Sequence, residues 1–223
     1  CSPRVRPGGV TPYVVSQMVS DVFAVADVVG EESFHLVGHD WGAGVGWGVV
    51  LANPGRIISW TPLSIAHPAA FGAALLNDPD QQSRSGYFAL FTTPGIPETL
   101  FTFNNFWFLK GIFEDMRAEK TDEYINVFSE PGALTAALNW YRASFGGNQI
   151  VNEVQDNDVT VPTLFIWGNE DEAVWRLGTE LMAEYMKVPY SIIEVNAGHW
   201  LISESPEQVI DPIVEHIRTN SKR

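Results

Sequence analysis

The chain has 223 residues, 45% of them hydrophobic, which is enough for one domain with a buried core, or for one domain with an insertion. Its 27 Asp and Glu residues outnumber the 13 Lys and Arg residues, and the net charge of −14 argues against nucleic acid or an anionic membrane as a partner. A single cysteine, Cys1, excludes an internal disulfide, and no apolar stretch reaches the roughly 18 to 20 residues of a membrane span. We therefore expect a soluble protein, cytoplasmic by its cysteine content, that acts on a neutral small molecule.

Helices and strands alternate through the first part of the chain. Apolar residues at helical spacing predict a helix from Thr11, its expected N-cap, to Val29. A strand over 34–38, a glycine-rich helix over 41–52 and a second strand over 57–63 follow. This alternation is typical of the α/β class and predicts a mainly parallel sheet.

The alternation stops in residues 66–155, where prolines interrupt aromatic and amphipathic segments. We interpret these residues as an inserted helical cap. Alternation then resumes, with predicted strands over 163–167 and 190–195 and predicted helices over 175–186 and 206–219. The sequence thus divides into a first part of the α/β core (1–65), the cap (66–155) and a second part of the core (156–223).

The junction between the first strand and the following helix reads Gly38-His39-Asp40-Trp41-Gly42. Small residues two positions before and after Asp40 are what a sharp turn requires if it is to expose one side chain with φ above zero. An aspartate in this place can also cap the next helix, but the whole pattern favours a nucleophile. A carboxylate is ionised at neutral pH, so it can attack a saturated carbon without help from a base.

Two later loops carry residues that suit a nucleophilic aspartate. Asp171 follows the strand over 163–167 and His199 follows the strand over 190–195, so both are expected at the carboxyl edge of the sheet. We expect His199 to act as a general base that Asp171 orients, with the neighbouring Glu170 as the alternative acid. The histidines outside these motifs are interpreted as structural: His35, His67 and His216.

The order of nucleophile, acid and base along the chain resembles the α/β-hydrolase fold family. Within that family, the His-Asp-Trp-Gly segment around Asp40 resembles epoxide hydrolases and haloalkane dehalogenases. The resemblance implies a two-step reaction, in which Asp40 forms an alkyl-enzyme ester and His199 with Asp171 activates the water that cleaves it. It implies no metal and no organic cofactor.

The predicted cap indicates how the leaving group is held. An opening epoxide leaves an alkoxide that needs a proton donor, whereas a halide needs only N–H donors. Residues 138–142, Leu-Asn-Trp-Tyr-Arg, resemble the epoxide-hydrolase segment that carries one ring-opening tyrosine, which implies that Tyr141 is the acid. The family's second tyrosine corresponds to Leu90, and we expect Tyr87, one helical turn earlier, to contact the same oxygen.

Three further residues are expected to contact the substrate or to lie near it. In an epoxide hydrolase the backbone N–H of Trp41 serves the oxyanion hole, whereas in a dehalogenase its indole binds the halide. Phe106 and Trp107 belong to an aromatic run of the predicted cap, which either lines an apolar pocket or packs in the cap core.

The resemblance therefore implies hydrolysis of a small apolar epoxide to a vicinal diol. Haloalkane dehalogenation by the same Asp-His-Asp triad is the alternative. An ester hydrolase or a carbon–carbon hydrolase is disfavoured by the aspartate nucleophile. The sequence does not specify the substrate, its stereochemistry or the oligomeric state.

The family's first four strands, and the His-Gly-x-Pro segment after the third of them, have no counterpart in this sequence. We therefore interpret the chain as lacking its N-terminal strands. The remaining sheet would expose an edge, so we expect association with a complementing N-terminal fragment or with a second copy of the chain. An inactive partial scaffold, which works only after complementation, is the alternative from another functional class.

Overall fold

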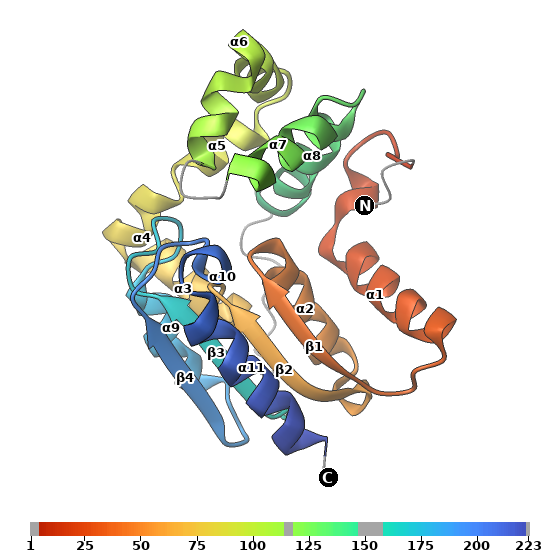
Figure 1. Cartoon of the computed structure of the whole chain (residues 1–223), viewed down its shortest axis with the longest axis vertical. Coiled ribbons are helices and arrows are strands. Elements are labelled where there is room, and N and C mark those ends of the chain that lie inside the picture. Colours follow the sequence, from red (N-terminus) through yellow and green to blue (C-terminus); the bar gives the residue numbers. More distant parts are fainter. Residues whose placement is uncertain (1–4, 114–117, 147–157, 222–223) are drawn as a thin grey trace. The chain divides into compact units, whose positions relative to one another are not determined.

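The computed structural model describes residues 5–113, 118–146 and 158–221. Contacts between residues divide the chain into two compact units, whose elements Figure 1 colours along the sequence. The sheet unit comprises Val15–Ser85 and Val151–Arg223, and the helical unit comprises Cys1–Val14 and Gly86–Ile150.

Four parallel strands form the sheet of the sheet unit, in the order β1 (Phe34–His39), β2 (Ile57–Leu63), β3 (Thr163–Gly168) and β4 (Tyr190–Val195). The strands β2 and β3 are buried along nearly their whole length, as expected for apolar strands covered on both faces. Backbone pairing places His39 beside Leu63, and Gly168 beside Val195. The carboxyl ends of the strands therefore meet at one edge, and the predicted parallel α/β sheet is confirmed.

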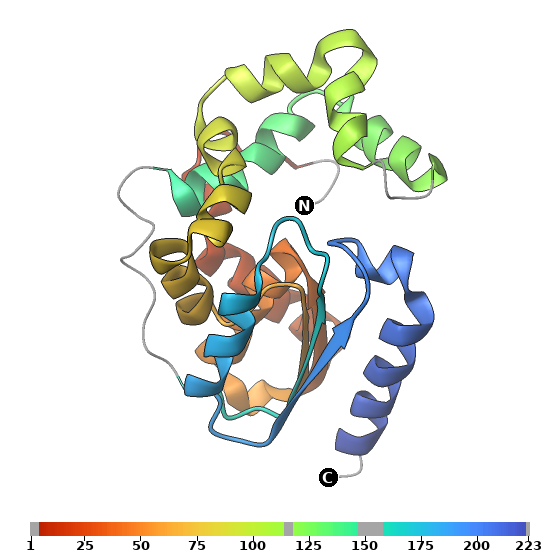
Figure 2. The same ribbon diagram turned by 90° about the vertical axis from the view of Figure 1, so that its left-hand side faces the viewer.

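Helices cover both faces of this sheet (Figure 2). α2 (Trp41–Ala52) packs on β1 and β2, while α11 (Pro206–Asn220) packs on β2 and β3 from the opposite face. α1 (Val15–Val29) packs against α2. The shorter helices of the unit are α3 (Pro68–Asn77), α4 (Pro79–Arg84), α9 (Arg176–Leu181) and α10 (Leu201–Glu204), with 3-10 helices at Pro54–Arg56 and Met182–Glu184.

Glycines in α2 let this helix lie directly on the sheet. A Cβ atom added at Gly46 would lie 2.1 Å from the ring of Trp60, which is fully buried in β2. Trp47 of α2 packs edge-to-face on Trp60, with ring centroids 5.5 Å apart, and its indole N–H donates to the carbonyl of Ile65. These contacts fix the helix that begins directly after Asp40.

The first helix begins later than predicted. Thr11–Tyr13 form a short 3-10 helix, and α1 starts only at Val15, after one extended residue. Tyr13 packs against alanines of α8 (Ala133–Phe145), so this segment belongs to the helical unit. Thr11 is consequently not the N-cap of α1, because a tertiary contact separates it from that helix.

α3 and α4 belong to the sheet unit, although the sequence assigns residues 66–85 to the predicted cap. The side-chain amide of Gln81, which is fully buried in α4, donates to the carbonyl of Ala173 and accepts from the N–H of Trp175. These bonds join α4 to the loop after β3. The boundary between the two units therefore falls before Gly86 rather than at residue 66.

The described part of the helical unit contains α5 (Tyr87–Thr92), α6 (Ile96–Ile112), α7 (Ala118–Phe128) and α8. α6 is interrupted at Phe103–Phe106, where the backbone leaves the helical conformation. Arg142 of α8 makes an ion pair with Glu98 of α6 at 2.8 Å and donates to the carbonyl of Thr93. These bonds connect α8 with α6 and with the end of α5.

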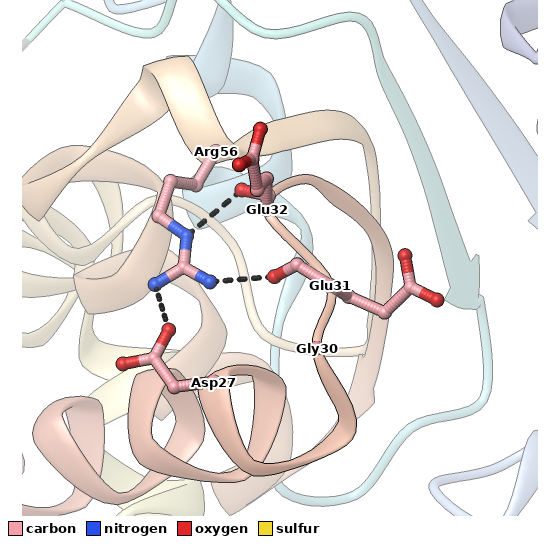
Figure 3. A pocket seen from close by; sticks show the side chains of 5 residues that line it. All are labelled: Asp27, Gly30, Glu31, Glu32 and Arg56. Carbon is pink, nitrogen blue, oxygen red and sulfur yellow. Dashed lines mark hydrogen bonds and ion pairs between the residues drawn. The ribbon is translucent and has the colours of Figure 1, made fainter.

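A surface depression beside Arg56 is a structural junction (Figure 3). The guanidinium donates to the Asp27 carboxylate at 2.7 Å and to the carbonyls of Glu31 and Glu32 at 2.7 and 2.9 Å. Arg56 directly precedes β2, so the depression lies at the amino ends of the strands, opposite the edge where the predicted site residues follow their strands. Its geometry indicates that Arg56 anchors the loop between α1 and β1.

Candidate active site

Asp40 occupies a sharp turn between β1 and α2. Its backbone has φ 52° and ψ −122°, a conformation that residues with side chains rarely adopt. A Cβ atom added at Gly38 would lie 2.4 Å from the carbonyl oxygen of Gly42, so position 38 requires glycine. A Cβ atom added at Gly42 would meet none of the described atoms within 4 Å, so the steric requirement of the turn falls on Gly38 and not on Gly42.

His199, in the loop after β4, lies between the two predicted aspartates. Its Nε2 atom is 3.1 Å from Oδ1 of Asp40, and its Nδ1 atom is 3.0 Å from Oδ2 of Asp171. Glu170, the alternative acid, is exposed, and its backbone N–H donates to the carbonyl of Ala197. The sheet unit therefore brings Asp40, His199 and Asp171 together at the carboxyl edge of the sheet.

Asp171 is completely buried, and its loop is fixed from several sides. Its Oδ1 atom accepts the backbone N–H groups of Ala173 and Val174 at 2.8 and 3.0 Å. Arg84 of α4 donates to the backbone carbonyl of Asp171 at 2.8 Å. A buried carboxylate is costly unless it is paired and hydrogen-bonded, and these amides together with His199 meet that need.

The two carboxylates beside His199 shift its protonation equilibrium, and His199 in turn shifts that of Asp40. Burial raises the pKa of the Asp40 carboxyl, but the hydrogen bond and charge of His199 and the backbone N–H of Trp41 outweigh burial, so this pKa lies below its ordinary value. Burial lowers the pKa of His199, but hydrogen bonds and attraction from Asp171 and Asp40 raise it to about 10. At neutral pH the site therefore holds an Asp40 carboxylate and a His199 imidazolium.

The raised pKa of His199 predicts that the protein loses stability as the pH rises above 7. The folded state keeps the proton up to about pH 10, whereas an unfolded histidine releases it near its ordinary pKa of 6.5. This stabilisation is complete below the unfolded pKa and is lost toward the folded pKa, with a slope of at most about 1.4 kcal/mol per pH unit. Urea unfolding followed by circular dichroism between about pH 7 and pH 9 measures the slope.

His199→Gln is the comparison for this measurement, because it removes the titrating group. We expect the free energy of unfolding of this variant to change less with pH over the same range. Equal slopes in the variant and the wild type would contradict the raised pKa of His199.

Tyr87 and Tyr141 lie together in the helical unit. Their rings meet edge-to-face, with centroids 6.0 Å apart. Phe91 packs against both rings, with centroids 5.0 Å from Tyr87 and 4.8 Å from Tyr141. Because α5 is helical from Tyr87 onward, Tyr87 and Leu90 lie one turn apart on the same face of the helix. Tyr87 needs this placement if it is to take the role of the family's second tyrosine, which corresponds to Leu90.

The three remaining predicted residues have different surroundings. Trp41 is the first residue of α2, and its backbone N–H bonds to the Asp40 carboxylate. Phe106 lies in the interruption of α6 with φ 61°, and Trp107, which follows it, is 68% exposed. The roles assigned to these three residues remain predictions.

Residues 4–211 match the alpha/beta hydrolase family. The chain belongs to this family. As in other alpha/beta hydrolases, its nucleophile candidate follows a strand at a sharp turn. A mutant of an epoxide hydrolase from Bacillus megaterium has the same fold as this chain, with a TM-score of 0.87 and 24% identity over 96% of this chain and 79% of that chain.

Two mammalian relatives of this chain bear the name epoxide hydrolase 4. The Mus musculus protein is 29% identical over 223 residues, which cover 95% of this chain and 61% of the relative. The Homo sapiens protein is 30% identical over 209 residues, which cover 88% of this chain and 57% of the relative. The chain thus spans about three-fifths of the length of these two relatives.

The loop that carries His199 has two partners that the sequence patterns do not single out. His39 bonds to the backbone carbonyl of His199, and Glu204 bonds to the N–H groups of Gly198 and Trp200. The signal in the sequence is position: His39 directly precedes Asp40, and Glu204 closely follows His199.

Within residues 5–113, 118–146 and 158–221, no group of three or more His, Cys, Asp or Glu side chains is arranged to hold a metal ion. In the same part of the chain, none of the helices combines the length and the apolar character that crossing a membrane requires.

Proposed function

We propose that this alpha/beta hydrolase opens an epoxide with Asp40 and hydrolyses the resulting ester with His199, which gives a vicinal diol. The observation that carries the proposal is the imidazole of His199 between two carboxylates, 3.1 Å from Asp40 and 3.0 Å from Asp171. Two relatives named epoxide hydrolase support an epoxide as the substrate class.

In the first step, an Oδ atom of Asp40 attacks a ring carbon of the epoxide. The ring carbon–oxygen bond breaks, and its electron pair stays on the oxygen as an alkoxide. The phenol of Tyr141, with Tyr87 as a second donor, gives this alkoxide a hydrogen bond and then a proton. The lowered pKa of Asp40 supports this step because it keeps the nucleophile ionised at neutral pH.

Ester formation removes the negative charge of Asp40, and this changes the chemistry of His199. One of the two carboxylates that raise the pKa of His199 is then neutral, so this pKa falls from its value of about 10. The imidazolium releases its proton through solvent, which restores the tyrosine phenol. His199 therefore becomes a base only after the alkyl-enzyme has formed.

In the second step, neutral His199 takes a proton from water, whose oxygen attacks the ester carbonyl carbon of Asp40. The backbone N–H of Trp41 donates to the oxyanion, and Asp171 stabilises the imidazolium. The tetrahedral intermediate then collapses, and the bond from the carbonyl carbon to the alkoxy oxygen breaks. The departing alkoxide takes the proton of the new carboxyl group, so the diol leaves behind an Asp40 carboxylate and a protonated His199.

Tyr141→Phe tests the choice of an epoxide as substrate. We expect kcat/KM for the hydrolysis of styrene oxide to fall by about 100-fold, because the alkoxide loses its proton donor while the ring still packs against Phe91. Tyr87→Phe should cause a smaller loss, about 10-fold, since a second donor remains. Diol formation is measured by chromatography. Tyr124→Phe, which alters an exposed tyrosine of α7, is the matched control and should not change the rate.

Haloalkanes provide the opposing outcome. Suppose the wild type releases bromide from a bromoalkane, Tyr141→Phe leaves that rate unchanged, and styrene oxide yields no diol. The protein would then be a dehalogenase that uses the same three residues, and the proposal would be wrong.

A further inference from the structure

The base loop, residues 197–200, contacts a histidine that the proposed reaction does not use. His39 is the last residue of β1 and directly precedes Asp40. Its ring packs beside those of His199 and Trp200, with centroids 4.9 and 5.7 Å away. Its Nε2 atom lies 2.8 Å from the backbone carbonyl oxygen of His199. A carbonyl oxygen only accepts, so Nε2 of His39 carries a hydrogen.

His39 is neutral in these surroundings. Burial lowers the pKa of His39, and the positive charge of His199 lowers it further, although Asp40, Asp171 and the bond to the His199 carbonyl act in the opposite direction. The neutral ring donates to the base loop without placing a second cation beside His199.

Glu204 of α10 holds the same loop from another side. Its Oε2 atom accepts the N–H of Gly198 at 2.6 Å, and its Oε1 atom accepts the N–H of Trp200 at 3.0 Å. A Cβ atom added at Gly198 would lie 3.2 Å from both oxygens, so glycine permits this close approach. Three consecutive residues of the base loop thus each have one backbone group fixed by His39 or Glu204.

We propose that His39 and Glu204 are positioning residues for ester hydrolysis. They hold the backbone of residues 198–200 so that the His199 ring stays directed toward the water that attacks the ester carbon of alkylated Asp40. This inference rests on the proposed function. In the free protein the Asp40 carboxylate itself holds Nε2 of His199 at 3.1 Å. Esterification makes that group neutral and weakens the bond, so the imidazole then depends on Asp171 and on its own backbone.

A pair of variants at position 39 separates the hydrogen bond from packing. His39→Phe keeps a ring and removes the donor, whereas His39→Gln keeps an N–H donor. We expect His39→Phe to slow ester hydrolysis by about 10- to 100-fold and alkylation by less than about 2-fold, because a small displacement of the base affects the step that uses it. His39→Gln should keep both rates near those of the wild type. Rapid quenching and mass spectrometry of the protein measure both steps with styrene oxide.

Glu204→Gln gives an independent test that does not require the His39 variants to fold. The side chain keeps its size but has one acceptor oxygen, so either Gly198 or Trp200 loses its partner. We expect the same selective slowing of ester hydrolysis. Glu207→Gln, at an exposed position in the first turn of α11, is the matched control and should leave both steps unchanged.

The result that would overturn this inference is unchanged hydrolysis in His39→Phe and Glu204→Gln, or equal slowing of both steps. A wild type that turns over styrene oxide without any alkyl-enzyme would instead overturn the proposed function. The carbonyl ¹³C chemical shift of His199 tests the hydrogen bond without activity. It should move upfield in His39→Phe and hold its value in His39→Gln, and an unmoved shift in His39→Phe would also overturn the inference.

Discussion

Asp40→Asn is expected to reduce diol formation from styrene oxide by at least about 10⁴-fold, because an amide in this position cannot form the alkyl-enzyme ester. The turn that holds residue 40 should persist, since its steric requirement falls on Gly38. Single-turnover chromatography measures the loss. Asp211→Asn, at an exposed position of α11, is the matched control and should retain full activity.

Isotope labelling identifies the atom at which water attacks. One turnover of the wild type in ¹⁸O water should place the label in the carboxylate of Asp40, because the attacked carbonyl carbon belongs to this residue. Mass spectrometry of the peptide that bears Asp40 detects the label. An unlabelled peptide from protein that has turned over its substrate would contradict the ester mechanism.

His199→Gln is expected to convert the reaction into a single alkylation. Asp40 and the phenols remain, so about one equivalent of epoxide should add to the protein, while kcat falls by about 10³-fold because the base is missing. Intact-protein mass spectrometry should show the added mass of one substrate molecule. The adduct should map to Asp40 after proteolysis.

The control for this experiment is His216→Gln. His216 belongs to α11, and its ring bonds to the backbone carbonyl of Pro162 rather than to a residue of the proposed site. This variant should form no lasting adduct and should retain turnover. Loss of turnover in His199→Gln without any adduct would contradict the expected result, because Asp40 would then not react with the epoxide when His199 is missing.

The elements that carry the site were predictable because their signals are local. The strands before Asp40 and Asp171 are short apolar runs, and each ends at or next to a glycine that the fold requires. A Cβ atom added at Gly38 or at Gly168 would lie 2.4 Å from a backbone oxygen. An apolar run followed closely by a glycine and an aspartate was thus enough to indicate which strands end near a candidate site residue.

Other features depended on contacts between distant residues, which the sequence does not display. Glu170 and Asp171 are adjacent carboxylates, and only the fold places Asp171 against His199 while Glu170 is exposed. The predicted helix start at Thr11 was wrong because Tyr13 packs against α8. The bond from His39 to the His199 carbonyl joins residues that lie 160 positions apart.

The bonds of α4 set a rule for the exchange of segments between related hydrolases. Gln81 and Arg84 hold the loop that carries Asp171. The helical unit begins at Gly86, two residues after the end of α4. A chimera that replaced residues 66–155 would discard both anchors together with the helices it was meant to exchange. A junction at Gly86 would keep them, so a graft there can vary the helical unit while the acid loop retains its native supports.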